Sequence, residues 1–376
     1  MKKITILNHD LDVGGIERYI SLLCKMLEDD YEIEIISTFK YASKPAFDFN
    51  KKIKITYLID GRPDLVSLKR LVKEKKFVLA FKECLGRIKL KKIEKKLTKK
   101  VIKNLDSDYI LTTRVKHHLW VYKYLDFNKT KAIMTEHNYH NDNKKYISKI
   151  VKCSKRFNVL VICTETLKEY YEKIVFCKCV YIPNVIEKTS RKNADINSNY
   201  LISVGRLSPE KGFSDLIDVF KIISNKLKDM KLLIVGEGYQ REELEEKIKL
   251  LNLEDNIILT GNKNSSELEK LYLKSSLYLM SSYTEIFGLV LIEAMNYGLS
   301  CVAFSSADGA KYLLKDGIGY LVDDRDKNKM AEVIISLLND RSMLKNRQRK
   351  MHEYVEEFSL KKVQNKWLEL FKKLGE

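Results

Sequence analysis

The residues of this 376-residue chain that are best placed to do chemistry are charged side chains and glycines next to apolar segments. Seven residues separate Glu285 from Glu293 in the sequence EIFGLVLIE. If this stretch were helical throughout, eight steps of about 1.5 Å would put the two carboxylates about 12 Å apart. Carboxylates that serve as acid and base on one glycosidic bond lie roughly 5–9.5 Å apart. The spacing therefore favours binding the two hydroxylated ends of one long ligand.

The glycine inside this motif predicts a change from loop to helix. Glu285 follows the apolar run LYLMSS and should lie in a loop, while Glu293 should lie within the next helix. The backbone N–H groups of Phe287, Gly288 and Leu289 would then face an anion such as phosphate. The simpler alternative is one exposed glutamate and one on a helix surface. Glu293 stands among apolar residues, however, and a carboxylate buried there needs a hydrogen-bond partner.

A second motif, VGRLSPEKG, places Arg206 and Lys211 five residues apart in a loop flanked by glycines. The loop follows an expected strand, and ligands of open α/β sheets bind at the carboxyl ends of strands. Arginine offers a planar fork of donors and lysine a compact charge, so the pair could hold a diphosphate. The alternative is a solvated loop in a lysine-rich protein.

A third motif, GGIER, follows the first expected strand and opens an amphipathic helix. Gly14 and Gly15 would let the backbone approach a ligand, with free N–H groups at the helix start for an anion. An ordinary tight turn is the alternative. The motif is not G-x-G-x-x-G, and Ser37-Thr38 stand where a dinucleotide site would need an acidic residue, which argues against such a site.

Short β-branched runs alternate with amphipathic helical segments, seven runs in the first half of the chain and six in the second. Most runs are apolar on both faces, which is typical of parallel strands covered by helices on both sides. The pattern predicts an α/β protein with two doubly wound, Rossmann-like domains. We expect an N-terminal domain over residues 1–190, a second domain over 197–355 and a C-terminal helix over 356–376.

The composition excludes several classes of protein. Hydrophobic residues make up 45% of the chain and charged residues 32%, which is typical of globular proteins and not of disordered ones. No run of eighteen apolar residues exists, and the first apolar stretch is too short for a signal peptide. We therefore expect a cytoplasmic protein whose seven cysteines are free thiols.

The net charge of +18, from 69 basic and 51 acidic residues, is concentrated in one segment. Residues 66–104 hold fifteen basic and three acidic residues, a local charge of +12. The segment predicts one or two helices with an apolar face. Either this face packs on the sheet, or the helix binds an anionic membrane surface, or the segment binds nucleic acid, for which no motif is visible. The apolar positions are Phe81, Leu85, Ile88, Leu90, Ile93, Leu97 and Val101.

Together these motifs resemble a known enzyme family. VGRLSPEKG, then LLIVGEG, then E-x7-E in EIFGLVLIEAM, followed by YGLS and DGIGYLV, are similar in order and spacing to the carboxyl domain of family 4 glycosyltransferases. The GGIER turn resembles the amino-domain loop of that family. The resemblance implies the GT-B fold, in which two Rossmann-like domains face each other across a cleft and C-terminal helices return to the N-terminal domain.

The resemblance also implies roles for the motif residues of the second domain. Arg206 and Lys211 would hold the diphosphate of a nucleoside-diphosphate sugar. Glu285 would contact hydroxyl groups of the transferred sugar, and Glu293 would bind the ribose. A UDP-sugar is expected rather than a GDP-sugar, with no further cofactor.

In the first domain the resemblance implies that Gly15, beside Gly14, lies under the phosphates or the sugar. His137, in the sequence TEHN at the end of an expected strand, would bind the sugar and stabilise developing charge, with His140 as the competing position. Residues 306–311 depart from the Gly-Gly pattern of the family in a loop that often lies near the donor, which leaves the donor sugar open.

We expect no metal. Asp10-Leu-Asp12 and Asp106-Ser-Asp108 spell the D-x-D pattern of metal-dependent glycosyltransferases, but the second precedes a strand, away from the expected site. Arginine and lysine side chains can instead stabilise the charge of the leaving nucleotide.

The sequence therefore predicts a retaining glycosyltransferase that moves a sugar from a nucleoside-diphosphate sugar to an oligosaccharide or lipid-linked acceptor. We expect it to act in the synthesis of bacterial surface polysaccharide such as capsule, as a peripheral protein at the inner face of the cell membrane. A sugar-nucleotide epimerase or phosphorylase of the same fold is the first alternative. A basic scaffold that binds membranes or nucleic acid is the second.

Overall fold

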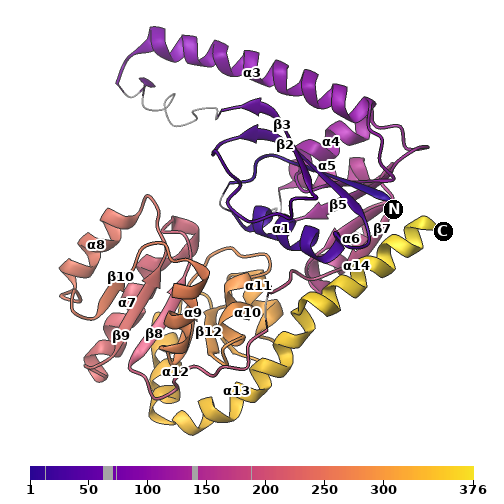
Figure 1. Cartoon of the computed structure of the whole chain (residues 1–376). Coiled ribbons are helices and arrows are strands. Elements are labelled where there is room, and N and C mark those ends of the chain that lie inside the picture. The colour runs from indigo at the N-terminus through magenta and orange to yellow at the C-terminus, as the bar shows by residue number, and fades with distance from the viewer. Residues whose placement is uncertain (13, 62–70, 73, 138–142, 188) are drawn as a thin grey trace. The chain divides into compact units, whose positions relative to one another are not determined.

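The computed structural model describes all residues of the chain except 13, 62–70, 73, 138–142 and 188. The described residues form two compact units (Figure 1). The first unit comprises residues 1–182 and 364–376, and the second comprises residues 183–363. The chain thus leaves the first unit once and returns to it within its last helix.

A seven-stranded parallel sheet forms the centre of the first unit. Its strands lie in the order β3-β2-β1-β4-β5-β6-β7, so the order reverses between β1 and β4. In the middle of the sheet Ile6 pairs with Ile35 and Leu111, and all three side chains are fully buried. The strands are β1 (Lys3–Asn8), β2 (Glu32–Lys40), β3 (Lys54–Asp60), β4 (Tyr109–Thr112), β5 (Lys131–Glu136), β6 (Val159–Ile162) and β7 (Lys178–Tyr181).

Helices connect these strands, and the end of the chain completes the unit. Trp367 is fully buried, and the ring of Phe371 lies 4.9 Å from the ring of Tyr109 at the start of β4. The side-chain amide of Gln364 donates to the carbonyl of Met26 (2.7 Å). The helices of this unit are α1 (Gly15–Leu27), α3 (Phe77–Lys103), α4 (Val115–Tyr124), α5 (Lys144–Ser154), α6 (Glu165–Glu172) and the larger part of α14 (Leu360–Gly375).

The second unit is built on a six-stranded parallel sheet in the order β10-β9-β8-β11-β12-β13, which reverses between β8 and β11. Phe220, Leu279 and Ile334 belong to the core that packs helices on this sheet. The strands are β8 (Tyr200–Val204), β9 (Lys231–Val235), β10 (Ile257–Leu259), β11 (Leu277–Met280), β12 (Ser300–Phe304) and β13 (Tyr320–Val322). The helices are η1 (Pro209–Lys211), α7 (Phe213–Lys226), α8 (Arg241–Leu250), α9 (Ser265–Leu273), α10 (Leu289–Met295), α11 (Asp308–Leu313), α12 (Lys327–Asn339), α13 (Arg341–Val355) and η2 (Glu356–Phe358).

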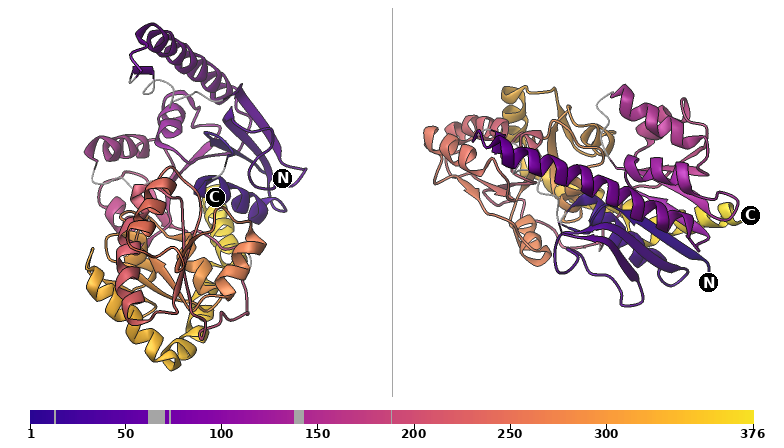
Figure 2. Two further views of the ribbon diagram at one scale, coloured as in Figure 1. Left: turned by 90° about the vertical axis from the view of Figure 1, so that its left-hand side faces the viewer. Right: turned by 90° about the horizontal axis from the view of Figure 1, so that it is seen from above.

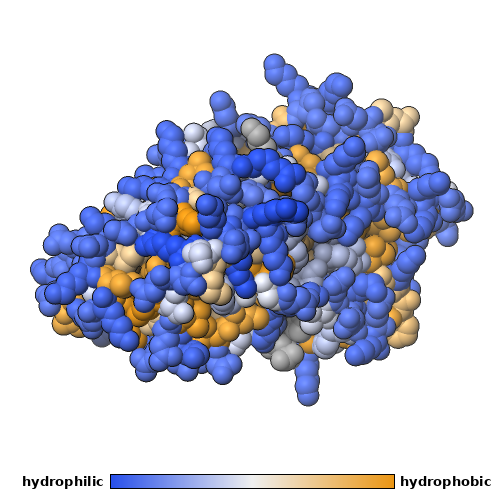
Figure 3. Space-filling model, turned by 90° about the horizontal axis from the view of Figure 1, so that it is seen from below, coloured by the Kyte–Doolittle hydropathy of each residue, from blue (hydrophilic) through white to orange (hydrophobic). Residues whose placement is uncertain are grey.

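The two parallel sheets confirm the predicted α/β fold class, in which helices connect the strands of each sheet. Apolar residues fill the two cores, while hydrophilic side chains cover most of the face in Figure 3.

The predicted limits of 1–190, 197–355 and 356–376 differ from the observed division at 182/183 and 363/364. The segment after Ile182 has no periodic pattern, but its backbone is bonded within the second unit. The N–H of Ser190 donates to the side chain of Asn296 (2.8 Å), and that of Ala194 donates to the carbonyl of Tyr297 (2.8 Å).

The basic segment forms one helix, α3, over its described residues 77–103. The predicted single apolar face is wrong, because Phe81, Leu85 and Ile88 fall on one side of a helix and Leu90 and Leu97 on nearly the opposite side.

Three of the four buried residues of α3 among those described lie in its carboxyl-terminal half, and Ala80 is the fourth. Glu94, Thr98 and Ile102 are buried there, while the amino-terminal half extends beyond β3 (Figures 1 and 2). Phe77 and Phe81 are 65% and 64% exposed. The interpretation that the apolar side chains of α3 pack on the sheet is therefore incorrect for this half.

Candidate functional site

The loop after β8 presents Arg206, whose side chain is exposed. The N–H of Leu207 donates to the carbonyl of Glu237 (2.9 Å) in the loop after β9. Gly236 has a φ of +140°, and a Cβ there would overlap the carbonyl oxygen of Gly205. The glycine therefore lets the two loops pack closely, and this contact fixes the backbone that carries Arg206.

Folding brings Lys211 and Glu285 together. Nζ of Lys211, at the end of η1, forms an ion pair with Oε2 of Glu285 in the loop between β11 and α10. The two side chains are 22% and 23% exposed, so solvent reaches the pair. The hydroxyl of Ser281 donates to the carbonyl of Lys211 (2.9 Å), and a Cβ on Gly212 would overlap the carbonyl oxygen of Ser281. Backbone and side chains thus both join the two loops.

Glu285 lies in a loop and Glu293 in helix α10, as the glycine between them predicts. Gly288 adopts a left-handed φ of +84° immediately before the helix begins at Leu289. The N–H of Gly309 donates to the carbonyl of Glu285 (2.7 Å) and holds this loop. Because residues 285–288 are not helical, the 12 Å spacing of a continuous helix does not apply.

The backbone around Phe287 combines close packing with free donors. The ring of Phe287 is buried, and a Cβ on Gly309 would overlap its carbonyl group. Among the described residues, the N–H groups of Phe287 and Gly288 have no acceptor, although both residues are buried. These are two of the three N–H groups that the sequence predicts to face phosphate.

Glu293 has the hydrogen-bond partner that its apolar surroundings require. The hydroxyl of Tyr272 lies 3.5 Å from its Oε2 and joins α9 to α10. Burial raises the pKa of Tyr278, on β11, and the charges of Glu285 and Glu293 raise it further. Both glutamates of the motif therefore lie around the same buried tyrosine.

The positive charges of Arg206 and Lys211 both lower the pKa of Glu210, which lies between them in the loop. Burial tends to raise the pKa of the Glu210 carboxyl, but the hydroxyl of Ser208 donates to it at 2.6 Å, and Arg206 and Lys211 lie nearby. The pKa is lowered as a result. The loop after β8 is therefore an electropositive environment.

In the first unit, the two glycines of the GGIER turn differ in their surroundings. A Cβ on Gly14 would overlap a carboxylate oxygen of Glu17, whereas nothing lies within 4 Å of a Cβ on Gly15. Arg114, which precedes α4, forms an ion pair with Glu17 (3.0 Å). Gly14 therefore accommodates Glu17, while Gly15 leaves open space for a ligand. Sequence reasoning missed this ion pair, because Arg114 lies 97 residues away from Glu17.

His137 follows β5 at the carboxyl edge of the first sheet. Its Nε2 lies 2.9 Å from the hydroxyl of Thr135, and its ring lies 4.2 Å from the ring of Tyr19. Burial, together with the charge of Arg114, lowers the pKa of His137 to about 3, so the imidazole is neutral near pH 7. The competing His140 lies outside the described residues.

Three further histidines, which sequence reasoning missed, gather at this edge. His9 follows β1, and its ring lies 6.3 Å from that of His117 in α4. Nδ1 of His118 lies 2.6 Å from the hydroxyl of Thr112. Burial lowers the pKa of His9 to about 4 and that of His118 to about 3, and lowers that of His117 as well. The edge therefore carries neutral imidazoles.

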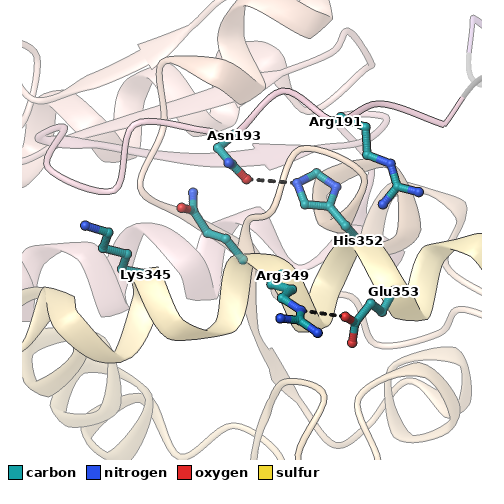
Figure 4. Close-up of a pocket in the computed structure, with 7 residues that line it drawn as sticks. Arg191, Asn193, Lys345, Arg349, His352 and Glu353 are labelled. Carbon is teal, nitrogen blue, oxygen red and sulfur yellow. Dashed lines mark hydrogen bonds and ion pairs between the residues drawn. The ribbon is translucent and has the colours of Figure 1, made fainter.

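A pocket of about 410 Å³ lies between α13 and the segment after β7 (Figure 4). Nε2 of His352 lies 2.8 Å from the side-chain oxygen of Asn193, and Arg349 pairs with Glu353 (2.7 Å). None of the predicted site residues lines it. The lining residues are Arg191, Asn193, Lys345, Gln348, Arg349, His352 and Glu353.

The D-x-D patterns lie in structural positions. The backbone N–H of Lys3 donates to Asp108 (2.8 Å), so this aspartate lies at the amino edge of the first sheet. The N–H of Asp12 donates to Asp10 (3.1 Å) within a turn. Over the described residues, His, Cys, Asp and Glu form no group of three or more that could hold a metal ion.

Comparison with known proteins identifies the family. The profile described as "Glycosyl transferases group 1" matches residues 185–373, which is half of the chain. The chain belongs to this glycosyltransferase family. It is therefore a sugar-transferring enzyme, and the family 4 resemblance is confirmed.

Relatives and solved structures agree with this assignment. The glycosyltransferase is 28% identical to an uncharacterized glycosyltransferase of Haemophilus influenzae, over 98% of this chain and 99% of the relative. It is 26% identical, over 98% of both chains, to a Campylobacter jejuni α-1,4-N-acetyl-D-galactosaminyltransferase whose name specifies a PP-undecaprenol-linked glycan.

The fold is similar to that of an S. aureus TarM mutant in complex with UDP, with a TM-score of 0.77 and 18% identity over 99% of this chain and 100% of that one. This likeness confirms the GT-B fold class. None of these matches is an epimerase or a phosphorylase.

No helix among the described residues of the glycosyltransferase is long and apolar enough to cross a membrane.

The buried neutral His118 predicts an acid-sensitive fold. An unfolded histidine binds a proton near pH 6.5, whereas folded His118 binds one only near pH 3. Between these values the unfolded state holds more protons, so this residue lowers the free energy of unfolding by about 1.4 kcal/mol per pH unit as pH falls. We expect His118→Asn to make the stability less dependent on pH between 6.5 and 4, measured by urea unfolding. Equal pH dependence in the two proteins, both folded at pH 7.5, would contradict the assignment.

Proposed function

We propose that this glycosyltransferase moves a sugar from a UDP-sugar to a hydroxyl group of a lipid-linked glycan. The observation that carries the proposal is the Lys211–Glu285 ion pair at the carboxyl edge of the second sheet. It joins the loops after β8 and β11, where the strand order reverses, and ligands of open α/β sheets bind at such a reversal. The UDP in the similar TarM structure supports a uridine donor, and the named PP-undecaprenol-linked glycan of the C. jejuni relative supports the acceptor class.

The ion pair suggests how the donor is received. The ammonium of Lys211 neutralises Glu285. A diphosphate held by Arg206 would compete for this ammonium, because phosphate oxygens accept strong charge-assisted hydrogen bonds. Glu285 would then accept hydrogen bonds from hydroxyl groups of the sugar, and Glu293 from those of the ribose. The free N–H groups beside Gly288 would face the phosphate.

The transfer itself breaks the bond between C1 of the sugar and the phosphate oxygen and forms a bond from C1 to the acceptor oxygen. The electron pair of the broken bond stays on UDP, whose phosphate takes the proton of the acceptor hydroxyl. Arg206 and Lys211 would stabilise the negative charge that develops on the diphosphate. We propose retention of the anomeric configuration, as the family 4 resemblance implies.

In the first unit, Gly14 and Gly15 would form the backbone beneath the sugar or the phosphates. Open space over Gly15 supports this role. His137 would bind the sugar as a neutral imidazole, which can accept a hydrogen bond and adds no positive charge beside a cationic sugar. This would let the site stabilise charge of opposite sign on the sugar and on the diphosphate.

We further propose that α3 docks on an anionic membrane. Phe77, Phe81, Leu85 and Ile88 follow one another at spacings of three and four and share one side of the helix. All four side chains are at least half exposed, although they are large and apolar. Burial of such side chains at the lipid interface is favourable.

Lysines continue this side of α3 toward its carboxyl end. Lys92, Lys95, Lys96 and Lys99 are exposed and lie on the side that Phe81 occupies about three to five turns earlier. Each cation near an anionic surface contributes about 1 kcal/mol. Such a helix would bring the enzyme to a lipid-carried acceptor at the inner face of the cell membrane, in a surface-polysaccharide pathway such as capsule synthesis.

Removal of either member of the ion pair should abolish most transfer. We expect Lys211→Ala and Glu285→Gln each to lower the transfer rate by two orders of magnitude or more, with the UDP-sugar that supports transfer selected from a panel. Lys345→Ala, which removes a cation from the pocket of Figure 4, is the control and should leave the rate unchanged. Near-normal rates in both site variants would remove the assignment.

The cations of the second unit predict transfer without a divalent metal. We expect the same rate with excess chelator as with added magnesium, because Arg206 and Lys211 supply the charge that a metal would supply. The measurement uses enzyme treated with chelator and desalted. Loss of activity with chelator, restored by magnesium, would contradict the proposal.

The exposed side of α3 predicts salt-sensitive binding to anionic vesicles. We expect flotation with vesicles that contain phosphatidylglycerol, and weaker flotation with pure phosphatidylcholine or at high salt. Phe77→Ser with Phe81→Ser should reduce the bound fraction severalfold. Leu250→Ser, at an apolar position that is 80% exposed in the second unit, is the matched control. Equal binding to both vesicle types would exclude the proposal.

A further inference from the structure

Arg325, in the turn between β13 and α12, has an unusual backbone conformation. Its φ of +59° lies in the left-handed region that favours glycine. Lys75, Asn252 and Asp316 also adopt this region, and the short polar side chains of Asn252 and Asp316 tolerate it well. An arginine has no such local compensation, so the contacts of its side chain must offset the cost of the conformation.

The guanidinium of Arg325 joins three elements at the carboxyl edge of the second sheet. Nη1 donates to the carbonyl of Ser281 after β11 (2.7 Å) and to the carboxylate of Asp215 in α7 (3.1 Å). Nη2 donates to the hydroxyl of Ser306 after β12 (2.8 Å). The guanidinium also lies 3.6 Å from the centre of the Tyr283 ring. A single side chain thus fixes the loops on both sides of it.

Asp215 provides the negative charge in this cluster. Burial tends to raise the pKa of the Asp215 carboxyl, but hydrogen bonds from Lys327 (2.7 Å) and from the hydroxyl of Tyr283 (2.6 Å) outweigh it, and the pKa is lowered. The carboxylate is therefore ionised at neutral pH and holds Arg325 and Tyr283 together.

Both loops that Arg325 holds are hydrogen-bonded to the segments that carry Lys211 and Glu285. The hydroxyl of Ser281 donates to the carbonyl of Lys211 (2.9 Å). The hydroxyl of Ser306 donates to the carbonyl of Ser282 (3.0 Å), three residues before Glu285. Displacement of the guanidinium would release the backbone on which Glu285 approaches Lys211.

We propose that Arg325 is a positioning residue of the donor site, which fixes the β11–α10 loop so that Glu285 reaches the transferred sugar. This inference rests on the proposed function, because it gives Arg325 its effect through Glu285. The guanidinium bonds to protein groups, those of Ser281, Asp215 and Ser306. Loss of Arg325 should therefore impair transfer of the sugar more than it weakens binding of the nucleotide.

The test is Arg325→Gly, which removes the guanidinium and suits the left-handed backbone. We expect kcat for transfer to fall at least tenfold, while the Kd for UDP, measured by calorimetry, changes less than threefold. In a Glu285→Gln background the same substitution should lower kcat less than threefold, because residues that act through one another are not additive.

Arg347→Ala is the matched control. The guanidinium of Arg347 lies 4.3 Å from the ring centre of Tyr320 in the same unit, and its loss should leave kcat unchanged. If Arg325→Gly does not fold, Arg325→Lys replaces it, since lysine keeps the charge but cannot donate to Ser281 and Ser306 as a fork.

The inference would be overturned if Arg325→Gly lowered kcat by the same factor in the wild type and in Glu285→Gln. It would also be overturned if Arg325→Gly lowered kcat and the affinity for UDP by the same factor. Either result would indicate a merely structural role. A wild-type kcat in Glu285→Gln would instead overturn the proposed function. A wild-type kcat in Arg325→Gly, with Glu285→Gln impaired, would overturn the positioning role alone.

Discussion

The ion pair between Lys211 and Glu285 depends on the way a parallel sheet gathers the ends of its strands. The two residues are 74 positions apart in the sequence, yet they lie in the loops after β8 and β11, which are neighbours in the sheet. Parallel strands deliver all their following loops to one edge, and the reversal of strand order leaves room for a ligand there. The glycines at 212, 236 and 309 then allow these loops to pack against one another without a Cβ between them.

The two units of this glycosyltransferase carry different charges at their sheet edges. In the second unit, cations near the surface are partly neutralised by carboxylates, as in the pair of Lys211 with Glu285. In the first unit, burial keeps His118 and His137 neutral near pH 7, because desolvation penalises the charged imidazole.

Local pattern predicted much of this structure. Each of the thirteen β-branched runs corresponds to a strand, because apolar runs between helical segments indicate parallel strands. The glycine at 288 correctly predicted that Glu285 lies in a loop and Glu293 in a helix. The basic segment was interpreted less well. Spacing describes which side chains share a side of α3, but not which of them become buried, and most of the buried ones lie in the half around Thr98.

The sequence by itself determined the α/β class, the placement of cations, glutamates and glycines next to strand ends, and the family to which those motifs belong. These features depend on neighbours within a few residues, where the repeats of strand and helix act. Only the tertiary structure decided that Arg114 pairs with Glu17, that His9 lies near His117, and that Arg325 holds the loop before Glu285. Such pairs form because strand order brings distant loops to one edge, and spacing along the chain carries no record of that order.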